Sequence, residues 1–142
     1  MLSVTEIWNL ALVMRLGQKR IMSTSEPGVE ARACGDVWGF TRLMTLSEHN
    51  WSFNRRVSTL AETDNDRPDD WAYRYAKPVD CIKIHHLLPQ TGVYDPRNRV
   101  KYEVFNEYIY SNEQYARAVY GTDVTDTTRF HAPFIAALSW HM

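Results

Sequence analysis

The sequence predicts an α+β fold: two helices come first, a block of strands and hairpins follows, and a last helix ends the chain. Three observations support this order. Apolar residues recur at helical spacing before residue 50, alternate with polar residues from Trp51 to about Val124, and return to helical spacing after Asp126. The 142 residues, 44% of them hydrophobic and 23% charged, are enough for one folded domain and argue against disorder.

The first helix is expected from Val4 to Leu16. Ser3 and Glu6 have the spacing of a capping box, and Gly17 stands where a helix-ending residue belongs. Apolar side chains spread over more than half of the circumference of this helix, so it needs cover from more than one direction. We expect part of that cover to come from another molecule.

A second helix is expected from about Glu26 to Ser47, capped by Ser25. One stripe of it is expected to face the core: Val29, Ala33, Val37, Phe40 and Met44. Residues off this stripe are expected to touch an adjacent subunit: Gly35, Trp38, Gly39 and Arg42. Each glycine costs a helix about 1 kcal/mol relative to alanine. A backbone that passes close to them would explain why two glycines stand at this spacing, although both could simply be tolerated.

Alternating residues predict the strands. They are expected at residues 53–59, 71–76, 81–88, 100–105, 108–111 and 115–124, the last with helix as a competitor because of its alanines. In the third strand, alternation places Ile82, Ile84, His86 and Leu88 on one side. Residues 62–70 form an acidic loop, residues 89–98 an exposed turn region, and Asn106-Glu107 a hairpin turn. Asp126 is expected to cap a final helix through Trp140, which shows no stop signal before Met142, as at a cut end.

No pattern of an enzyme, a metal site or a cofactor site is found. His85 and His86 are adjacent and point to opposite faces of a strand, and the acidic loop lacks the glycine and the closing glutamate of a calcium loop. No phosphate-binding glycine pattern and no nucleophile elbow is present, and Cys34 and Cys81 are expected to be buried free thiols. A small enzyme or binding module with an unrecognised site stays as an alternative.

The charge of the chain gives no reason to expect duplex DNA binding or attachment to a membrane surface. The net charge is −1, and the basic pairs Lys19-Arg20 and Arg55-Arg56 are typical of solvated surface. No signal peptide opens the chain, and no apolar run approaches the roughly 20 residues that span a bilayer. Aromatic residues, at 13%, are typical of protein interfaces, although they also stack on nucleic-acid bases.

Several separated motifs resemble the head-to-tail adaptors of tailed bacteriophages, above all the tail tubular protein A family. The most specific is the run from Asp70 to Ile82, DWAYRYAKPVDCI, which is similar to a W-x-Y-x-Y-x-x-P-x-D-C pattern of that family. Supporting stretches keep their order along the chain: IWNLAL at 7–12, WSF at 51–53, YEV at 102–104, YIYSN at 108–112 and FHAPFIAAL at 130–138. Family members usually continue with further helix beyond the point where this chain ends, which puts the portal contact of this chain in doubt.

The resemblance implies an α-helical bundle with an inserted antiparallel β-rich domain. In that layout, residues 1–50 are the N-terminal helical part, 51–125 the β-rich insertion and 126–142 a helix that completes the bundle. The family further implies a virion structural protein without catalytic activity. It forms a ring, generally of twelve copies, between the portal protein and the tail nozzle or tube protein, and DNA passes through the lumen without sequence reading. A tail-completion or tail-tube protein is the neighbouring alternative.

The matching motif itself is expected to be structural. Its members are Trp71, Tyr73, Tyr75, Pro78, Asp80 and Cys81. The aromatic residues are expected in the core of the β-rich part more than in a binding patch. Asp80 is expected to fix the turn after Pro78 through its side chain. Asn106-Glu107 and the loop 90–98 are expected to touch the next tail component.

Overall fold

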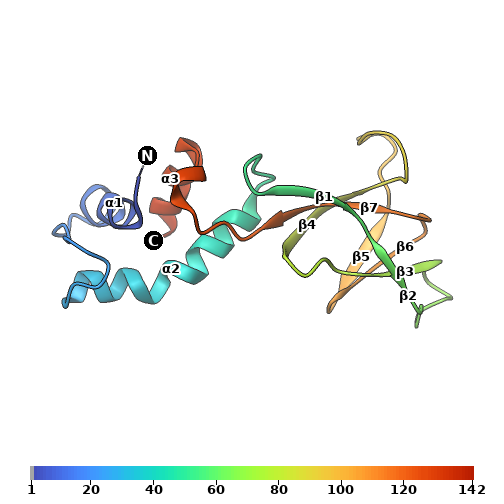
Figure 1. Cartoon of the computed structure of the whole chain (residues 1–142), viewed down its shortest axis with the longest axis horizontal. Helices are drawn as coiled ribbons and strands as arrows, with labels where there is room; N and C mark the ends of the chain where they lie inside the picture. Colours follow the sequence, from blue (N-terminus) through green and yellow to red (C-terminus); the bar gives the residue numbers. More distant parts are fainter. Residues whose placement is uncertain (1) are drawn as a thin grey trace. The chain divides into compact units, whose positions relative to one another are not determined.

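The computed structural model describes residues 2–142, and these divide into two compact units (Figure 1). Unit 1 consists of the residues up to Asn54 together with Asp123–Met142, and unit 2 is Arg55–Thr122. Unit 1 holds the helices and unit 2 holds all the strands. The β-rich segment therefore lies within the expected range of 51–125, a few residues shorter at each end.

The first helix of unit 1 begins as the sequence predicts. In α1 (Val4–Asn9), Glu6 N donates to Ser3 Oγ at 3.2 Å and Ser3 N donates to Glu6 Oε2 at 2.6 Å, which confirms the capping box. The helix continues as a π-helix, η1 (Leu10–Arg15), and Gly17 follows with a φ of 64°. The side chain of Asn9 bonds both the N–H and the C=O of Ile21, so the segment after the helix is tied back to it.

The two later helices start at other residues than expected. α2 (Val29–Glu48) has Gly28 as its N-cap without a side-chain bond, so the predicted cap by Ser25 was wrong. Asp126 caps a short 3-10 helix, η2 (Thr127–Arg129), and not α3 (Ala132–His141), where Pro133 already supplies a helix start. α3 therefore begins at a proline, which fixes the backbone φ of the first turn, whereas α2 begins after a glycine.

Phe134 of α3 anchors an aromatic cluster in unit 1. Its side chain is fully buried, and the ring centroids of Trp51, Phe53 and Phe130 lie 5.2, 5.0 and 4.6 Å away. Distances of about 4.5–7 Å with tilted rings are favourable for aromatic pairs. A second buried cluster of unit 1 joins α1, η1 and α2: Trp8, Leu12, Ile21, Ala31 and Cys34.

Unit 2 consists of two antiparallel sheets. The three-stranded sheet has the order β1-β7-β4, with β1 at Arg55–Thr59, β7 at Arg117–Thr122 and β4 at Cys81–Leu88. The four-stranded sheet has the order β2-β3-β6-β5, with β2 at Ala61–Thr63, β3 at Tyr73–Ala76, β6 at Tyr108–Ser111 and β5 at Tyr102–Phe105. The strand β2 was not predicted, because it is short and begins the acidic loop.

The chain passes from the first sheet to the second at Leu60. Its N–H donates to the C=O of Ala116 at 3.0 Å, and its side chain is buried between the sheets. Buried residues from both sheets form one core: Leu60, Tyr75, Ile84, Leu87, Ile109, Ala116, Ala118 and Tyr120. The hairpin turn at Asn106 has a φ of 56°, a value that asparagine tolerates better than most residues.

Strict alternation in β4 was a wrong prediction. The pairing of β4 with β7 shifts register between Ile84 and His86, so Ile84 and Leu87 face the core together. A β-bulge of this kind inserts one residue and changes which side chains face inward. His86 and Leu88, expected on the side of Ile84, instead belong to the opposite face.

The expected α-helical bundle with an inserted β-rich domain was wrong. Residues 2–142 are rich in sheet, with two antiparallel sheets and three helices that do not form a bundle. The lengths of the helices explain this: α1 has 6 residues and α3 has 10, whereas α2 has 20. At 1.5 Å per residue, neither short helix can cover α2 along its length, as bundle packing requires.

Candidate functional site

α2 presents two faces with different surroundings. The residues that it buries are mostly small or polar: Ala31, Cys34, Thr41, Thr45 and Leu46. Thr45 can lie there because its hydroxyl donates to the C=O of Thr41 at 2.8 Å, so no buried polar group is left unsatisfied at this position. Apart from Leu46, the large aliphatic side chains and the phenylalanine of α2 lie elsewhere on its circumference.

The stripe expected to face the core is the exposed one, so that prediction was wrong. Val29 is 79% exposed and Phe40 is 74% exposed, and Val37 and Leu43 are also on the surface. We call these four residues the apolar stripe of α2. Periodicity predicts that an apolar stripe is covered, but it does not say by which molecule. At about 1.5–3 kcal/mol for a fully buried side chain, covering these four would contribute on the order of 4 kcal/mol.

Two of the four residues expected at a subunit interface are engaged within unit 1. Trp38 is half-buried, with its ring centroid 6.1 Å from that of Trp8. The guanidinium of Arg42 lies 5.8 Å from the Trp38 ring and donates to both carboxylate oxygens of Asp123, at 3.0 and 3.1 Å. Only 13% of the Arg42 side chain is exposed, against 36% of Asp123, so the guanidinium is the better shielded partner of this bidentate pair.

The two glycines of α2 differ. A Cβ added at Gly35 would lie 3.7 Å from the ring of Trp8, which is ordinary contact, and one added at Gly39 would meet nothing within 4 Å. Gly35 faces Trp8 of the same chain, but the space there would also accept an alanine. A partner backbone at Gly39 stays a prediction.

The aromatic residues of the Trp71–Cys81 motif lie in and around the core of unit 2. Tyr75 is only 1% exposed, and Tyr73 packs beside it with ring centroids 6.3 Å apart. Burial raises the pKa of the Tyr75 hydroxyl, which donates to the C=O of Glu113. Trp71 Nε1 donates to a carboxylate oxygen of Glu103 at 3.1 Å. These contacts hold the motif against β5 and the chain that follows β6.

Asp80 has a different role from the one expected. The turn after Pro78 is closed by the backbone, with Cys81 N donating to Pro78 O at 3.1 Å. The carboxylate of Asp80 instead accepts from Arg56 at 2.8 Å and from the hydroxyl of Tyr120 at 3.1 Å. It therefore links β1 and β7 to the start of β4, and the predicted bond to its own turn was wrong. Burial raises the pKa of the half-buried Cys81 thiol, which is free.

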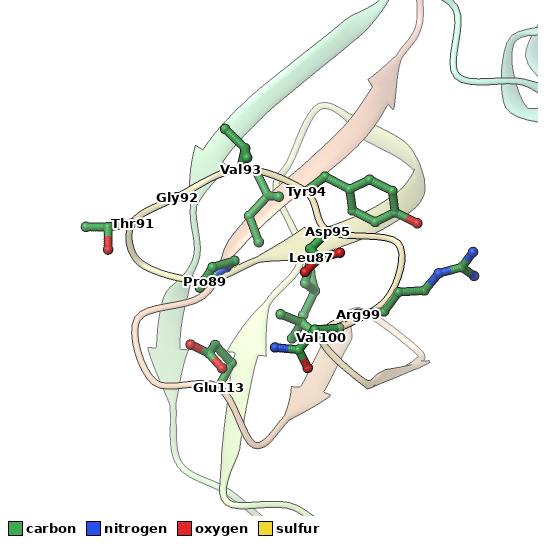
Figure 2. Close-up of a pocket in the computed structure, with 12 residues that line it drawn as sticks. Leu87, Pro89, Thr91, Gly92, Val93, Tyr94, Asp95, Arg99, Val100 and Glu113 are labelled. Carbon is green, nitrogen blue, oxygen red and sulfur yellow. The ribbon is translucent and has the colours of Figure 1, made fainter.

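The segment between β4 and β5 encloses a pocket of about 320 Å³ (Figure 2). Its walls include Leu87, Val93, Tyr94, Val100 and Glu113. The side chains of Thr91 and Arg99 point away from it on opposite sides. A pocket of this size is at the lower limit for small ligands, and its outer wall is a surface loop.

Arg117 holds this loop in place. From the first residue of β7, its Nε donates to Pro89 O at 2.9 Å and its Nη2 donates to Gly92 O at 2.7 Å. On the other side of the loop, the ring of Tyr94 lies 4.2 Å from that of His86. Sequence analysis missed Arg117, although a single arginine inside the buried run from Ala116 to Tyr120 was the available signal.

We expect Arg117→Ala to release the loop 89–100. Hydrogen bonds to a charged group contribute about 1.5–3 kcal/mol each, so losing two should raise the population of the open loop by about 100-fold. Trypsin cleavage after Arg97 and Arg99 measures this opening. Arg55→Ala, an exposed arginine on β1, is the matched control and should leave the cleavage rate unchanged. Equal cleavage of Arg117→Ala and the unchanged protein would contradict this role.

The described residues of the two units show no cluster of metal-binding side chains. In residues 2–142, no three His, Cys, Asp or Glu residues come together in a group that could hold an ion. Burial lowers the pKa of His85 and of His86, which favours their neutral forms. In the acidic loop, Asp66 is occupied by Arg74 at 3.4 Å and by the hydroxyl of Tyr110 at 2.7 Å.

None of the described helices is both long and apolar enough to cross a bilayer. The apolar stripe of α2 is an exposed apolar surface on a long helix, and we take it as the candidate functional site. Comparison with known proteins adds no assignment, since no protein-family model matches the chain and no curated protein matches it significantly.

Proposed function

We propose that this chain is a virion structural protein, a head-to-tail adaptor that assembles as a ring between the portal and the tail of a bacteriophage. DNA passes through the lumen of the ring. The motif from Asp70 to Ile82 and the other stretches that resemble the tail tubular protein A family support this proposal. The proposal does not draw on the architecture of the family, because the helical bundle is missing from residues 2–142.

The observation that carries the proposal is the apolar stripe of α2. Val29 and Phe40 each leave about three quarters of their surface in water, at 79% and 74%. Exposed apolar residues that adjoin one another on a single helix face are typical of a surface that another protein covers. Since a ring requires every subunit to present a surface to its neighbour, a self-assembling structural protein explains this exposure directly.

Oligomeric state in solution tests the proposal. Light scattering coupled to size exclusion, followed by negative-stain microscopy, should show rings of the chain alone or rings that form when the portal protein is added. A compact monomer at all concentrations, with and without portal, would sink the proposal. A tail-completion or tail-tube protein would also form rings, but would bind to the tail tube and not to the portal.

A small binding module is the second candidate, and the pocket beneath the loop 89–100 favours it. Its volume of about 320 Å³ would admit a small molecule. This candidate predicts a monomer whose melting temperature rises with a ligand, and it leaves the apolar stripe of α2 without a purpose. The stripe is therefore the reason to prefer the structural role.

A further inference from the structure

One face of the three-stranded sheet carries cations and no acid. The strand register places Arg55, Gly121 and Lys83 side by side in one row, and Val57, Val119 and His86 in the next. A third row contains Thr59, Arg117 and Leu88. These rows face away from the core, which holds Ala118 and Tyr120 of the alternate positions of β7. The loop that follows β4 covers part of the second and third rows, where Val119 and Leu88 are buried and Tyr94 packs on His86. The open cations are those of the first row, and we call Arg55 and Lys83 the cationic face.

The two cations of this face have no partner of opposite charge among the described residues. Arg55 and Lys83 are exposed, and neither forms an ion pair within the described part of the chain. Gly121 between them has no side chain, and two strand spacings set the Arg55 and Lys83 backbones about 10 Å apart. The carboxylate of Asp95, in the adjoining loop, accepts from the N–H of Arg97 instead. An acidic group can therefore approach both cations without displacing an existing contact.

The acidic loop at residues 62–70 carries the opposite charge. Glu62, Asp64 and Asp69 are exposed and form no ion pair with any residue of 2–142. The loop is nevertheless held in shape, because Asn65 accepts from Arg67 N at 2.9 Å and Arg67 pairs with Glu103 at 3.3 Å. A loop that is already ordered loses little conformational entropy when it binds.

The two charged surfaces cannot neutralise each other within one copy. Both belong to unit 2, and the β2–β3 connection that carries the acidic loop lies at the opposite end of this unit from the start of β1 (Figure 1). Complementary surfaces at two ends of one rigid unit can meet only between copies. Such a contact joins two different surfaces, which is the kind of interface that closes rings.

We infer that the cationic face of one copy receives the acidic loop of the next copy. This inference rests on the proposed assembly and specifies how its subunits are oriented. The apolar stripe of α2 supplies affinity. The charges determine that the cationic face of one subunit meets the acidic loop of the next. Complementary charges at an interface favour one orientation and suppress others. Duplex DNA fits the cationic face less well, since two unpaired cations would neutralise few phosphates, and tight binding to DNA uses about 6–10 phosphate contacts.

Charge reversal tests the contact. The face variant Arg55→Glu/Lys83→Glu and the loop variant Asp64→Lys/Asp69→Lys should each self-associate at least about 10-fold more weakly than the unchanged protein, because like charges then meet. An equal mixture of the two variants should assemble again. The acidic face of the face variant then meets the basic loop of the loop variant, and the basic face of the loop variant meets the acidic loop of the face variant. Lys19→Glu/Arg20→Glu reverses two exposed cations of unit 1, outside both charged surfaces of unit 2, and is the matched control.

Sedimentation velocity gives the association constants, and circular dichroism shows that each variant is folded. Unchanged assembly of the face variant, or a mixture that stays dissociated, would overturn the charge contact. Duplex DNA binding that the face variant loses and the loop variant keeps would also overturn it, in favour of a nucleic-acid surface. If the unchanged protein assembles and the charge reversals do not weaken its assembly, the charge contact is contradicted while the proposed function stands. An unchanged protein that is always monomeric contradicts both this contact and the proposed function.

Discussion

Phe40→Glu is expected to dissociate the assembly while leaving the subunit folded. Phe40 is 74% exposed, so its replacement removes little packing within the chain. In an interface, the same change loses roughly 2 kcal/mol of apolar burial and also buries a carboxylate, which costs at least as much again. The dissociation constant should therefore rise by about 1,000-fold, as measured by sedimentation or light scattering.

Met22→Glu is the matched control for this prediction. Met22 is 90% exposed and lies before α2, outside the apolar stripe, so its replacement should change neither assembly nor melting temperature. A large fall in the melting temperature of the Phe40→Glu monomer would mean that the stripe is covered within its own chain. Equal assembly of Phe40→Glu and the unchanged protein would remove the stripe as the interface.

Tyr75→Ala is expected to destabilise unit 2 by about 3–5 kcal/mol, the usual cost of replacing a buried aromatic residue by alanine. Tyr75 is 1% exposed and lies in the core between the two sheets. Tyr75→Phe keeps the ring and removes only the hydroxyl, which donates to Glu113 O and accepts from Ala116 N at 3.5 Å. This second variant should lose about 1–3 kcal/mol, because the Glu113 carbonyl is left without its donor.

Urea unfolding followed by tyrosine and tryptophan fluorescence measures both free energies. The pair of variants separates the packing of the ring from the hydrogen bonds of the hydroxyl. A Tyr75→Ala protein that keeps its stability but no longer assembles would show that the Trp71–Cys81 motif is a binding patch and not part of the core.

Local patterns predicted the strands better than the helices. β4 was expected at 81–88, and β5 and β6 were expected on either side of Asn106-Glu107, where the structure has them. Turn residues and alternation act within a few positions, so they can be recognised without knowledge of the rest of the chain. The bulge in β4 was not predictable, because it depends on the pairing with β7.

The orientation of α2 could not be predicted from the residues of α2 alone. Its more apolar stripe is exposed, and its less apolar face packs on Trp8. What decides this is the packing partner, since Ala31 and Cys34 of α2 share a buried cluster with Trp8 of α1. Arg117 escaped notice for a similar reason, because its two acceptors are backbone carbonyls that no side-chain pattern reveals.

The crossing of the chain at Leu60 has a consequence for how unit 2 opens. Leu60 lies between β1 and β2 and is bonded to Ala116, which follows β6 and precedes β7, so each sheet contains a strand that continues into the other. Neither sheet can come apart without pulling on the strands of its neighbour. The amide protons of both sheets should therefore exchange with solvent deuterium through one shared cooperative opening, and not as two separately melting layers.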